Sequence, residues 1–302
     1  MKLIALLIGL AVERLATQLF HLRELRWLDR VIDGGFEQVN RFANWPPMLL
    51  VLLLAIVLVL PVLAVRLLLG GALFGFAYLV FAVVALFFSF GPKDIGEEIS
   101  EYCAAVESGD EERLRKTAKA LLEREPPPES GERSTDIEAA VCVQANNRLF
   151  AVIFWFVLLG PLGAWAYRVT DLIRRRAVFN AARDASSESA ASLSVTAAED
   201  LHGWLAWIPA RLTAFGYAMA GNFEAALSVW RSAGSAGMPP GIQNENLLAR
   251  VGVGALAMGT IEEESAAERG VRGALAANRL VLRSLLIWAA VIAAMTLYGW
   301  SL

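Results

Sequence analysis

The sequence predicts an all-α integral membrane protein with about four transmembrane helices, an amphipathic N-terminal helix and membrane-associated cytoplasmic helices. Of its 302 residues, 57% are hydrophobic and only 19% are charged, and the mean hydropathy of +0.51 lies well above the range of soluble domains. Four apolar segments reach the roughly 20 residues that a helix needs to cross a bilayer. The polar stretches between them are rich in helix-forming residues.

Residues 1–47 are expected to form a retained amphipathic or partly inserted helix. The start, MKLIALLIGLAVERLATQLFHL, resembles a signal peptide, but Glu13 and Arg14 stand where a small-residue cleavage site would be expected. The apolar periodicity of a helix also continues through Leu15, Leu19 and Leu22. Glu13 is either a charge at headgroup level beside Arg14 or a buried site residue.

Residues 48–90 predict a transmembrane hairpin. Its two segments are Met48 to Leu69 and Gly71 to Phe90. They meet around Gly70 and Gly71, where the missing side chains allow the chain to reverse.

Residues 91–148 form a polar helical region. A helix from Ile95 to Leu122 carries charges at the spacing of i,i+4 pairs and ends before the prolines of EREPPPES. Thr135 and Glu138 match a capping box, which predicts that a new helix begins there and runs into the next span. The two cysteines, Cys103 and Cys142, are expected to be small buried residues rather than a disulfide.

The third apolar segment, residues 149–169, contains Gly160, Pro161 and Gly163 at its centre. We expect it to cross the membrane with a kink, and the alternative is a re-entrant pair of half-helices. The polar residues at the two ends of this segment are Asn147, Arg148 and Asp171. They would be neighbours only if the segment turned back or a later helix reached across.

Residues 170–279 are expected to form a cytoplasmic helical region, and residues 280–302 a C-terminal transmembrane helix. Arg174, Arg175 and Arg176 follow the third segment directly, and the positive-inside rule places them in the cytoplasm. With four simple crossings, residues 91–148 would face the periplasm; with a re-entrant third segment, both polar regions would share the cytoplasmic side. The small-residue stretch ARDASSESAASLSVTAAED reads as a mobile linker.

The stretch DLHGWLAWIPARLTAF, residues 200–215, places an arginine on an apolar helix face. At about 100° per residue, Arg211 falls in line with Trp204, Ile208 and Phe215, and Asp200 lies near the same line. A charge on such a face needs a partner, a headgroup or a ligand. Arg211 therefore either reaches lipid phosphate or binds an anion.

Several function classes are disfavoured. The net charge of −3 gives no basic field, so no nucleic-acid partner is expected. Two histidines and two cysteines are too few for a multi-ligand zinc or iron–sulfur site, so no metal is expected. The sequence lacks a P-loop, a dinucleotide-binding glycine motif, a zinc-protease motif and a hydrolase nucleophile elbow, and we assign no catalytic residue.

Four stretches together resemble the AmpE family of bacterial inner-membrane proteins, over essentially the whole chain. They are ERLATQLFHLRELRWLDR, ANNRLFAVIFWFVLLGPLGAWAYRVTDLIRR, DLHGWLAWIPARLTAFGYAMAGNFEAAL and TLYGW, and IPARLTA is the most specific piece. The resemblance implies a multi-pass regulatory protein linked to β-lactamase induction and muropeptide signalling.

The middle and later stretches are also similar to cobalamin-biosynthesis membrane proteins of the CobD/CbiB type, which take part in an ATP-dependent amide synthesis. The residues that fit the pattern best are Asp200 and Ile208 to Leu212, while Glu138 and Asp171 fit it loosely. The G-R-D-T-like loop of those proteins is absent before Glu138, where PPPESGERST stands instead. An intact amide synthase is therefore the alternative interpretation, with ATP as its candidate cofactor.

The favoured interpretation is a regulatory or sensor protein of the inner membrane that binds an anionic ligand at its cytoplasmic face. Besides the lipid bilayer, its candidate partners are a nucleotide, a muropeptide or another protein, and its oligomeric state is left open. The candidate ligand-binding residues are Arg211, Asp200, Arg148, Asn147, Asp171 and Glu138.

Overall fold

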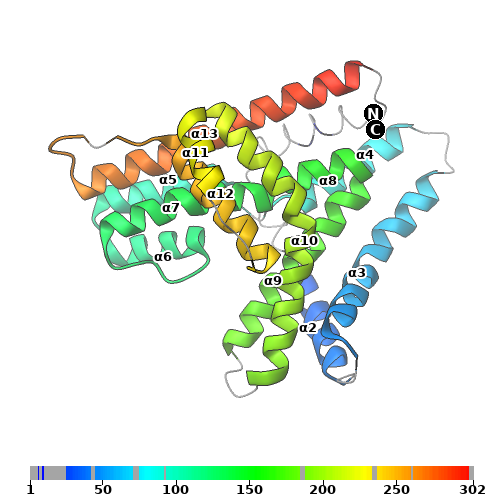
Figure 1. The fold of residues 1–302 in the computed structure, drawn as a ribbon. Coiled ribbons are helices and arrows are strands. Elements are labelled where there is room, and N and C mark those ends of the chain that lie inside the picture. The colour runs from blue at the N-terminus through cyan, green and yellow to red at the C-terminus, as the bar shows by residue number, and fades with distance from the viewer. Residues whose placement is uncertain are drawn as a thin grey trace.

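The computed structural model describes residues 6, 9, 25–41, 45–70, 75–91, 93–183, 188–232, 237–259 and 261–298, and every regular element among them is helical. The all-α prediction is thus confirmed (Figure 1). Three described helices are long and apolar enough to cross a membrane, namely Pro47–Leu68, Ser130–Leu159 and Ala266–Leu297. The predictions for Glu13 and Arg14 fall outside the described residues.

The first described helices are α2 (Arg26–Arg41), α3 (Pro47–Gly70) and α4 (Gly75–Ser89). Helix α3 corresponds to the first expected span, and large apolar side chains such as Ile56, Val57 and Leu60 are exposed along it. The second expected span is the apolar helix α4, which is only 15 residues long. Helices α3 and α4 both pack against α9 (Pro161–Arg183).

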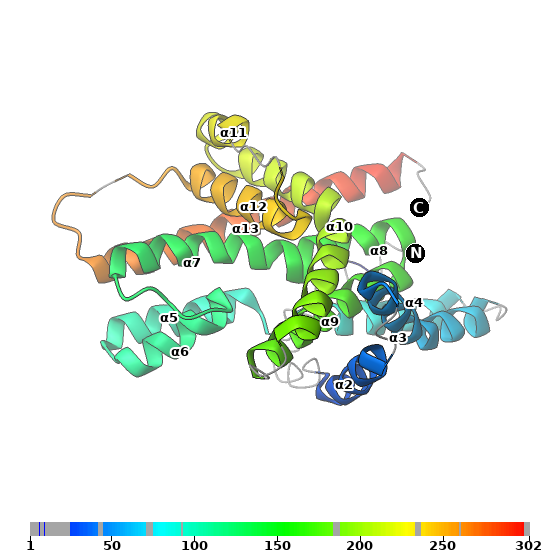
Figure 2. The ribbon, with the colours of Figure 1, turned by 60° about the horizontal axis from the view of Figure 1, so that its bottom comes forward.

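A helical hairpin, α5 (Ile95–Ser108) and α6 (Glu111–Leu122), lies at one end of the molecule beside α7 (Ser130–Ala145) (Figure 2). The side chains of Asp94 and Asp110 cap the two hairpin helices, and Gly109, with φ of 67°, makes the turn between them. Helix α6 ends at Glu123, and the proline run follows.

The expected capping box at Thr135 and Glu138 is wrong. Helix α7 already begins at Ser130, so Thr135 lies inside it and its hydroxyl donates to the carbonyl oxygen of Gly131. Glu138 is turned away from the helix start and into the core, where it pairs with Arg269. The chain does use a capping box elsewhere, at Ser265 and Glu268, where α13 (Ala266–Leu297) begins.

The third apolar segment does not form a single helix. Helix α7 continues through the π-helical turn η2 (Asn146–Phe150) into α8 (Ala151–Leu159), and the chain then reverses at Gly160 into α9. Gly160 has φ of 73° and ψ of −156°, a conformation suited to glycine. A Cβ on Gly163 would meet the carbonyl oxygen of Trp155, so its absence lets α8 and α9 pack side by side. The expected kinked crossing is therefore replaced by a helical hairpin.

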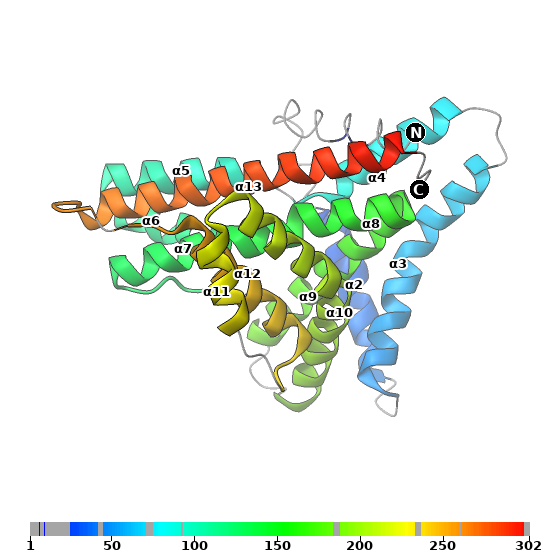
Figure 3. The ribbon, with the colours of Figure 1, turned by 45° about the horizontal axis from the view of Figure 1, so that its top comes forward.

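The C-terminal half contains α10 (Glu188–Ala220), α11 (Phe223–Ser232), α12 (Pro240–Leu256) and α13. Helix α10 includes Pro209 and begins at Glu188, so most of the expected linker is helical. Helix α13 includes residues 280–297 of the expected C-terminal span and starts well before it. It runs along α7 in all three ribbon views (Figure 3). Helix α10 packs against α9, α12 and η2, so it connects the two halves of the chain.

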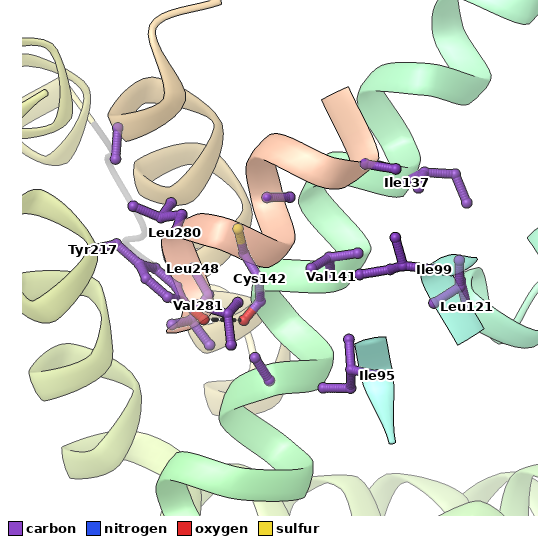
Figure 4. Close-up of a cluster of buried hydrophobic side chains, with 14 of the residues drawn as sticks. Ile95, Ile99, Leu121, Ile137, Val141, Cys142, Tyr217, Leu248, Leu280 and Val281 are labelled. Atoms are coloured by element: carbon purple, nitrogen blue, oxygen red, sulfur yellow. Dashed lines mark hydrogen bonds between the residues drawn. The ribbon is translucent and has the colours of Figure 1, made fainter. Parts of the chain in front are cut away.

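The largest core cluster joins α5, α6, α7, α10, α12 and α13 (Figure 4). The hydroxyl of Tyr217 donates to the carbonyl oxygen of Cys142 at 2.7 Å, which ties α10 to α7. Cys103 and Cys142 are both free and buried, which confirms the expectation of small packed residues. This core holds α5, α7, α10 and α12, which contribute to the candidate site, while α9 packs in the two smaller clusters.

Candidate functional site

The candidate site is built around Asp171, a carboxylate on α9 with no solvent exposure. Arg168 Nη1 lies 2.7 Å from one of its oxygens, Arg174 Nη2 lies 3.2 Å from the other, and Arg175 Nε lies 3.0 Å away. These arginines stand three residues before and three and four residues after Asp171, so the helical repeat itself places all three on one face. The result is a guanidinium cage around one buried carboxylate.

A second group of polar residues comes from the π-helical turn. Arg148 is buried, and its guanidinium donates to Glu98 of α5 at 2.7 Å and to Gln144 at 3.0 Å. Asn146 accepts a hydrogen bond from Thr213 of α10 at 3.1 Å. Asn146, Asn147 and Arg148 are consecutive and all buried. The wider π turn presents them to different neighbouring helices, and such turns often occur at functional sites.

Glu123 connects the two groups. Its carboxylate lies 2.7 Å from Arg175 Nη1, 3.5 Å from Arg148 Nη2 and 3.8 Å from Arg174 Nη2. Four arginines and three carboxylates thus form one cluster, which is buried at Asp171 and partly exposed at Glu123. We call it the arginine cluster: Arg148, Arg168, Arg174, Arg175, Glu98, Glu123 and Asp171. The formal charges of four arginines and three carboxylates give the arginine cluster a net charge of +1.

Burial and neighbouring charges shift the pKa values of three site residues. Burial would raise the pKa of Asp171, but the charges of Arg175, Arg168 and Arg174 outweigh it and hold that pKa well below its ordinary value. Burial raises the pKa of Glu98 against the opposing charge of Arg148. Burial, together with the charge of Arg174, lowers the pKa of His202 to about 3. His202 is therefore neutral at physiological pH.

Several donors of the site have no hydrogen-bond partner within the described part of the chain. Buried unpartnered atoms include Arg168 Nε, Arg174 Nε, Arg175 Nη2 and His202 Nε2. His202 Nε2 lies 3.9 Å from an oxygen of Asp171, which is beyond hydrogen-bonding distance. Buried donors without acceptors are costly and rare in folded proteins. An additional acceptor, preferably anionic, would satisfy them.

A cleft with about 500 Å³ of empty space, counted to its open mouth, adjoins the arginine cluster. Arg174 and His202 line it, together with Asn147 of η2 and Asn244 of α12. Gly203 and Gly241 let α10 and α12 approach closely there, because a Cβ on Gly203 would meet the backbone of Gly241. Two acids, Glu199 and Glu245, also line the cleft, and burial raises the pKa of Glu245.

The structure brings together three of the six residues that the sequence nominated. Asp171 and Arg148 belong to the arginine cluster, and Asn147 lines the cleft beside it. Glu138 lies apart, in an ion pair with Arg269 of α13.

Asp200 and Arg211 do not join them. Asp200 precedes His202 by two residues and Arg211 follows it by nine, so both point to nearly the opposite side of α10. Arg211 stacks on the ring of Trp207, 3.8 Å from its centre, and donates to Asn244 at 3.0 Å. Arg211 therefore does not line the cleft itself, although its partner Asn244 does.

Sequence reasoning missed Arg168, His202, Glu98 and Glu123 as site residues, and it used Arg174 and Arg175 only to orient the chain. The available signal was the spacing of arginines around Asp171 on a single helix face. Arg176, the third residue of the arginine run, points elsewhere and pairs with Asp33 of α2 at 2.7 Å. Among the described residues, no group of three or more histidine, cysteine or acidic side chains is arranged to hold a metal ion.

Comparisons with known proteins give the site its family context. Over 152 residues, the chain is 27% identical to the cobalamin biosynthesis protein CobD of Stutzerimonas stutzeri (strain A1501), which covers 50% of this chain and 48% of that protein. The chain thus spans about half the length of this relative. No solved structure matches the chain. Residues 1–301 match the family described as regulatory signalling modulator protein AmpE. The chain therefore belongs to the AmpE family, and it is a multi-pass membrane protein.

Proposed function

We propose that this AmpE-family protein is an inner-membrane sensor, linked to β-lactamase induction and muropeptide signalling, that binds an anionic small ligand in the cleft beside the arginine cluster. The observation that carries the proposal is the set of buried polar atoms without hydrogen-bond partners, above all Arg174 Nε and His202 Nε2, since both residues line the cleft. Membership of a family of regulatory signalling modulators supports the sensing role.

The ligand chemistry follows from the donors. A guanidinium offers a planar fork of N–H groups that matches a phosphate or a carboxylate. Neutral His202 can add a donor without adding charge when its hydrogen is on Nε2. The acids Glu199 and Glu245 line other parts of the cleft, so the anionic group of the ligand would bind at Arg174 and away from them. Asn147 and Asn244 can accept or donate at the walls of the cleft, so they would help to select the rest of the ligand.

The reversal at Gly160 supports a cytoplasmic position for the cleft. It returns the chain so that η2 and the start of the arginine run at Arg174 lie together. Residues 91–148 and 170–279 would then share one side of the membrane, and the positive-inside rule assigns the side that carries Arg174, Arg175 and Arg176 to the cytoplasm.

The proposal is tested by thermal unfolding of the purified protein in detergent, with an anhydro-muropeptide and with Mg-ATP. A ligand at one hundred times its Kd stabilises the folded state by about 2.7 kcal/mol. We expect stabilisation by at least one ligand in the wild type, and its loss in Arg174→Gln.

Arg250→Gln is the matched control, because Arg250 is an exposed arginine of α12 on which the cleft does not depend. Stabilisation that persists in Arg174→Gln, or that disappears equally in Arg250→Gln, would contradict the proposed site. Stabilisation by Mg-ATP alone would identify the ligand as a nucleotide rather than a muropeptide.

A further inference from the structure

We propose that the Glu123 carboxylate is an internal occupant of the anion site, and that an external anion displaces it and so releases the end of helix α6. This inference rests on the anion site of the proposed function, and it adds how occupancy of that site would be converted into a signal. The shared ligand chemistry is a phosphate or carboxylate group that competes with the glutamate for the same guanidinium groups.

The contacts of Glu123 are those of a bound anion. Its two oxygens lie within ion-pair distance of Arg175, Arg148 and Arg174, which come from two different helices, η2 and α9. Glu123 belongs to neither η2 nor α9. It directly follows Leu122 and caps the C-terminus of α6. The carboxylate therefore reaches the arginines from outside, as a ligand would.

The backbone of Glu123 adopts a conformation that a glutamate does not favour, and its side chain contacts the arginines from this conformation. Glu123 has φ of 56°, the left-handed conformation that helices usually assign to glycine or asparagine at this position. The residues that follow include the run Pro126 to Pro128, which cannot extend the helix. The chain thus adopts a conformation unfavourable for glutamate at the point where its side chain meets three arginines.

Two carboxylates at the site differ in how readily they can be replaced. The Asp171 side chain has no exposure and sits inside its own helix face, so it is a fixed part of the cage. The Glu123 side chain is 27% exposed, so solvent and solutes can reach it without opening the core. Arg174 both lines the cleft and contacts Glu123, so an anion in the cleft would meet a guanidinium that the internal carboxylate already occupies.

Exchange of carboxylate for ligand also preserves the electrostatic balance. Adding an anion while Glu123 stays would crowd two negative groups around Arg174 and Arg175. If Glu123 leaves as the ligand arrives, each arginine keeps an anionic partner. The element released is the C-terminal end of α6. Its other attachments include the buried side chains of Leu114, Ala118 and Leu121 and, just after the helix, the surface pair of Arg124 with Asp136.

The experiment compares Glu123→Gln with Glu125→Gln in the full-length protein in detergent. Glu125 is a matched control, because it lies two residues away and forms only exposed ion pairs with Arg115 and Lys119. Inorganic pyrophosphate serves as the probe, with binding measured by calorimetry and the release of residues 111–122 measured by hydrogen exchange. Removing the competing charge should tighten pyrophosphate binding roughly tenfold or more in Glu123→Gln.

We further expect pyrophosphate to speed amide exchange in residues 111–122 of the wild type, and Glu123→Gln without ligand to show that faster exchange already. Glu125→Gln should resemble the wild type in both respects. Equal or weaker pyrophosphate affinity in Glu123→Gln, beside normal binding that depends on Arg174, would overturn the displacement mechanism and leave the anion site intact. If neither the wild type nor Glu123→Gln bound pyrophosphate, a muropeptide or Mg-ATP, the proposed function itself would fail.

Discussion

The buried, neutral His202 predicts a specific dependence of stability on pH. The pKa of His202 is lowered from its ordinary 6.5 to about 3 by burial and by the charge of Arg174. As the pH falls below 6.5, the unfolded chain takes up a proton at this residue, whereas the folded chain does so only near pH 3. The free energy of unfolding therefore falls with pH in this window, and the two pKa values give a loss of roughly 2 kcal/mol between pH 8 and pH 5.

The substitution His202→Gln removes this titration and keeps a side chain that can donate a hydrogen bond. The variant is expected to be less stable than the wild type at pH 8, and the difference should shrink by about 2 kcal/mol at pH 5. The other groups near His202, which are Asp171, Arg174 and Arg175 and the cleft acids Glu199 and Glu245, are present in both proteins, so their titration cancels to first order.

The assay is denaturant unfolding in detergent, followed by tryptophan fluorescence at several pH values. If the wild type and His202→Gln lost stability in parallel from pH 8 to pH 5, the reasoning about a buried neutral histidine would be refuted.

Three further predictions follow from the packing. Arg269→Gln leaves the buried Glu138 without its cation and should lower the free energy of unfolding by roughly 3 kcal/mol. The double variant with Glu138→Gln should recover most of that loss. A double variant no more stable than Arg269→Gln would contradict the pairing. Gly163→Ala should lower the free energy of unfolding by about 2 kcal/mol or more, because its Cβ meets the carbonyl oxygen of Trp155. Gly131→Ala, whose Cβ meets nothing within 4 Å, should be neutral or stabilising in the same denaturant unfolding assay. Cys103 and Cys142 should react with a maleimide only after denaturation, and rapid labelling of the native protein would show that they are not buried.

The apolar runs located the membrane helices α3 and α13 and the shorter apolar helix α4, because composition and length alone decide whether a helix can cross a bilayer. The reversal at Gly160 was harder to predict. The Gly-Pro-x-Gly pattern is compatible with a kink as well as with a turn, and the turn depends on what α9 packs against, namely α3, α4 and α10.

Local patterns failed where distant partners decided the outcome. Thr135 and Glu138 have capping-box spacing, but Arg269 lies 131 residues from Glu138 and attracts its carboxylate into the core. The small residues before Asp200 looked like a linker, yet Ala197 and Ala198 are buried because small side chains allow close helix packing there.

The candidate site was predictable in part. Asn147, Arg148 and Asp171 were expected to be neighbours if the third segment turned back, and they do gather around one site. His202 gave no signal, since a single histidine beside tryptophans is ordinary for a packed helix. No local pattern marked Glu98 and Glu123, because their arginine partners lie in other helices.

Because of the π-helical turn η2, the site depends on the number of residues in this turn as well as on their identities. A π turn contains one residue more than the α-helical path it replaces. Losing the codon of Asn146, Asn147, Leu149 or Phe150 would restore regular helix there and rotate α8 by about 100° relative to α7. Arg148 would then leave Glu98, and the reversal at Gly160 would direct α9 elsewhere. We expect in-frame single-codon deletions here to abolish function as completely as the loss of Asp171, even though they spare every charged residue of the site.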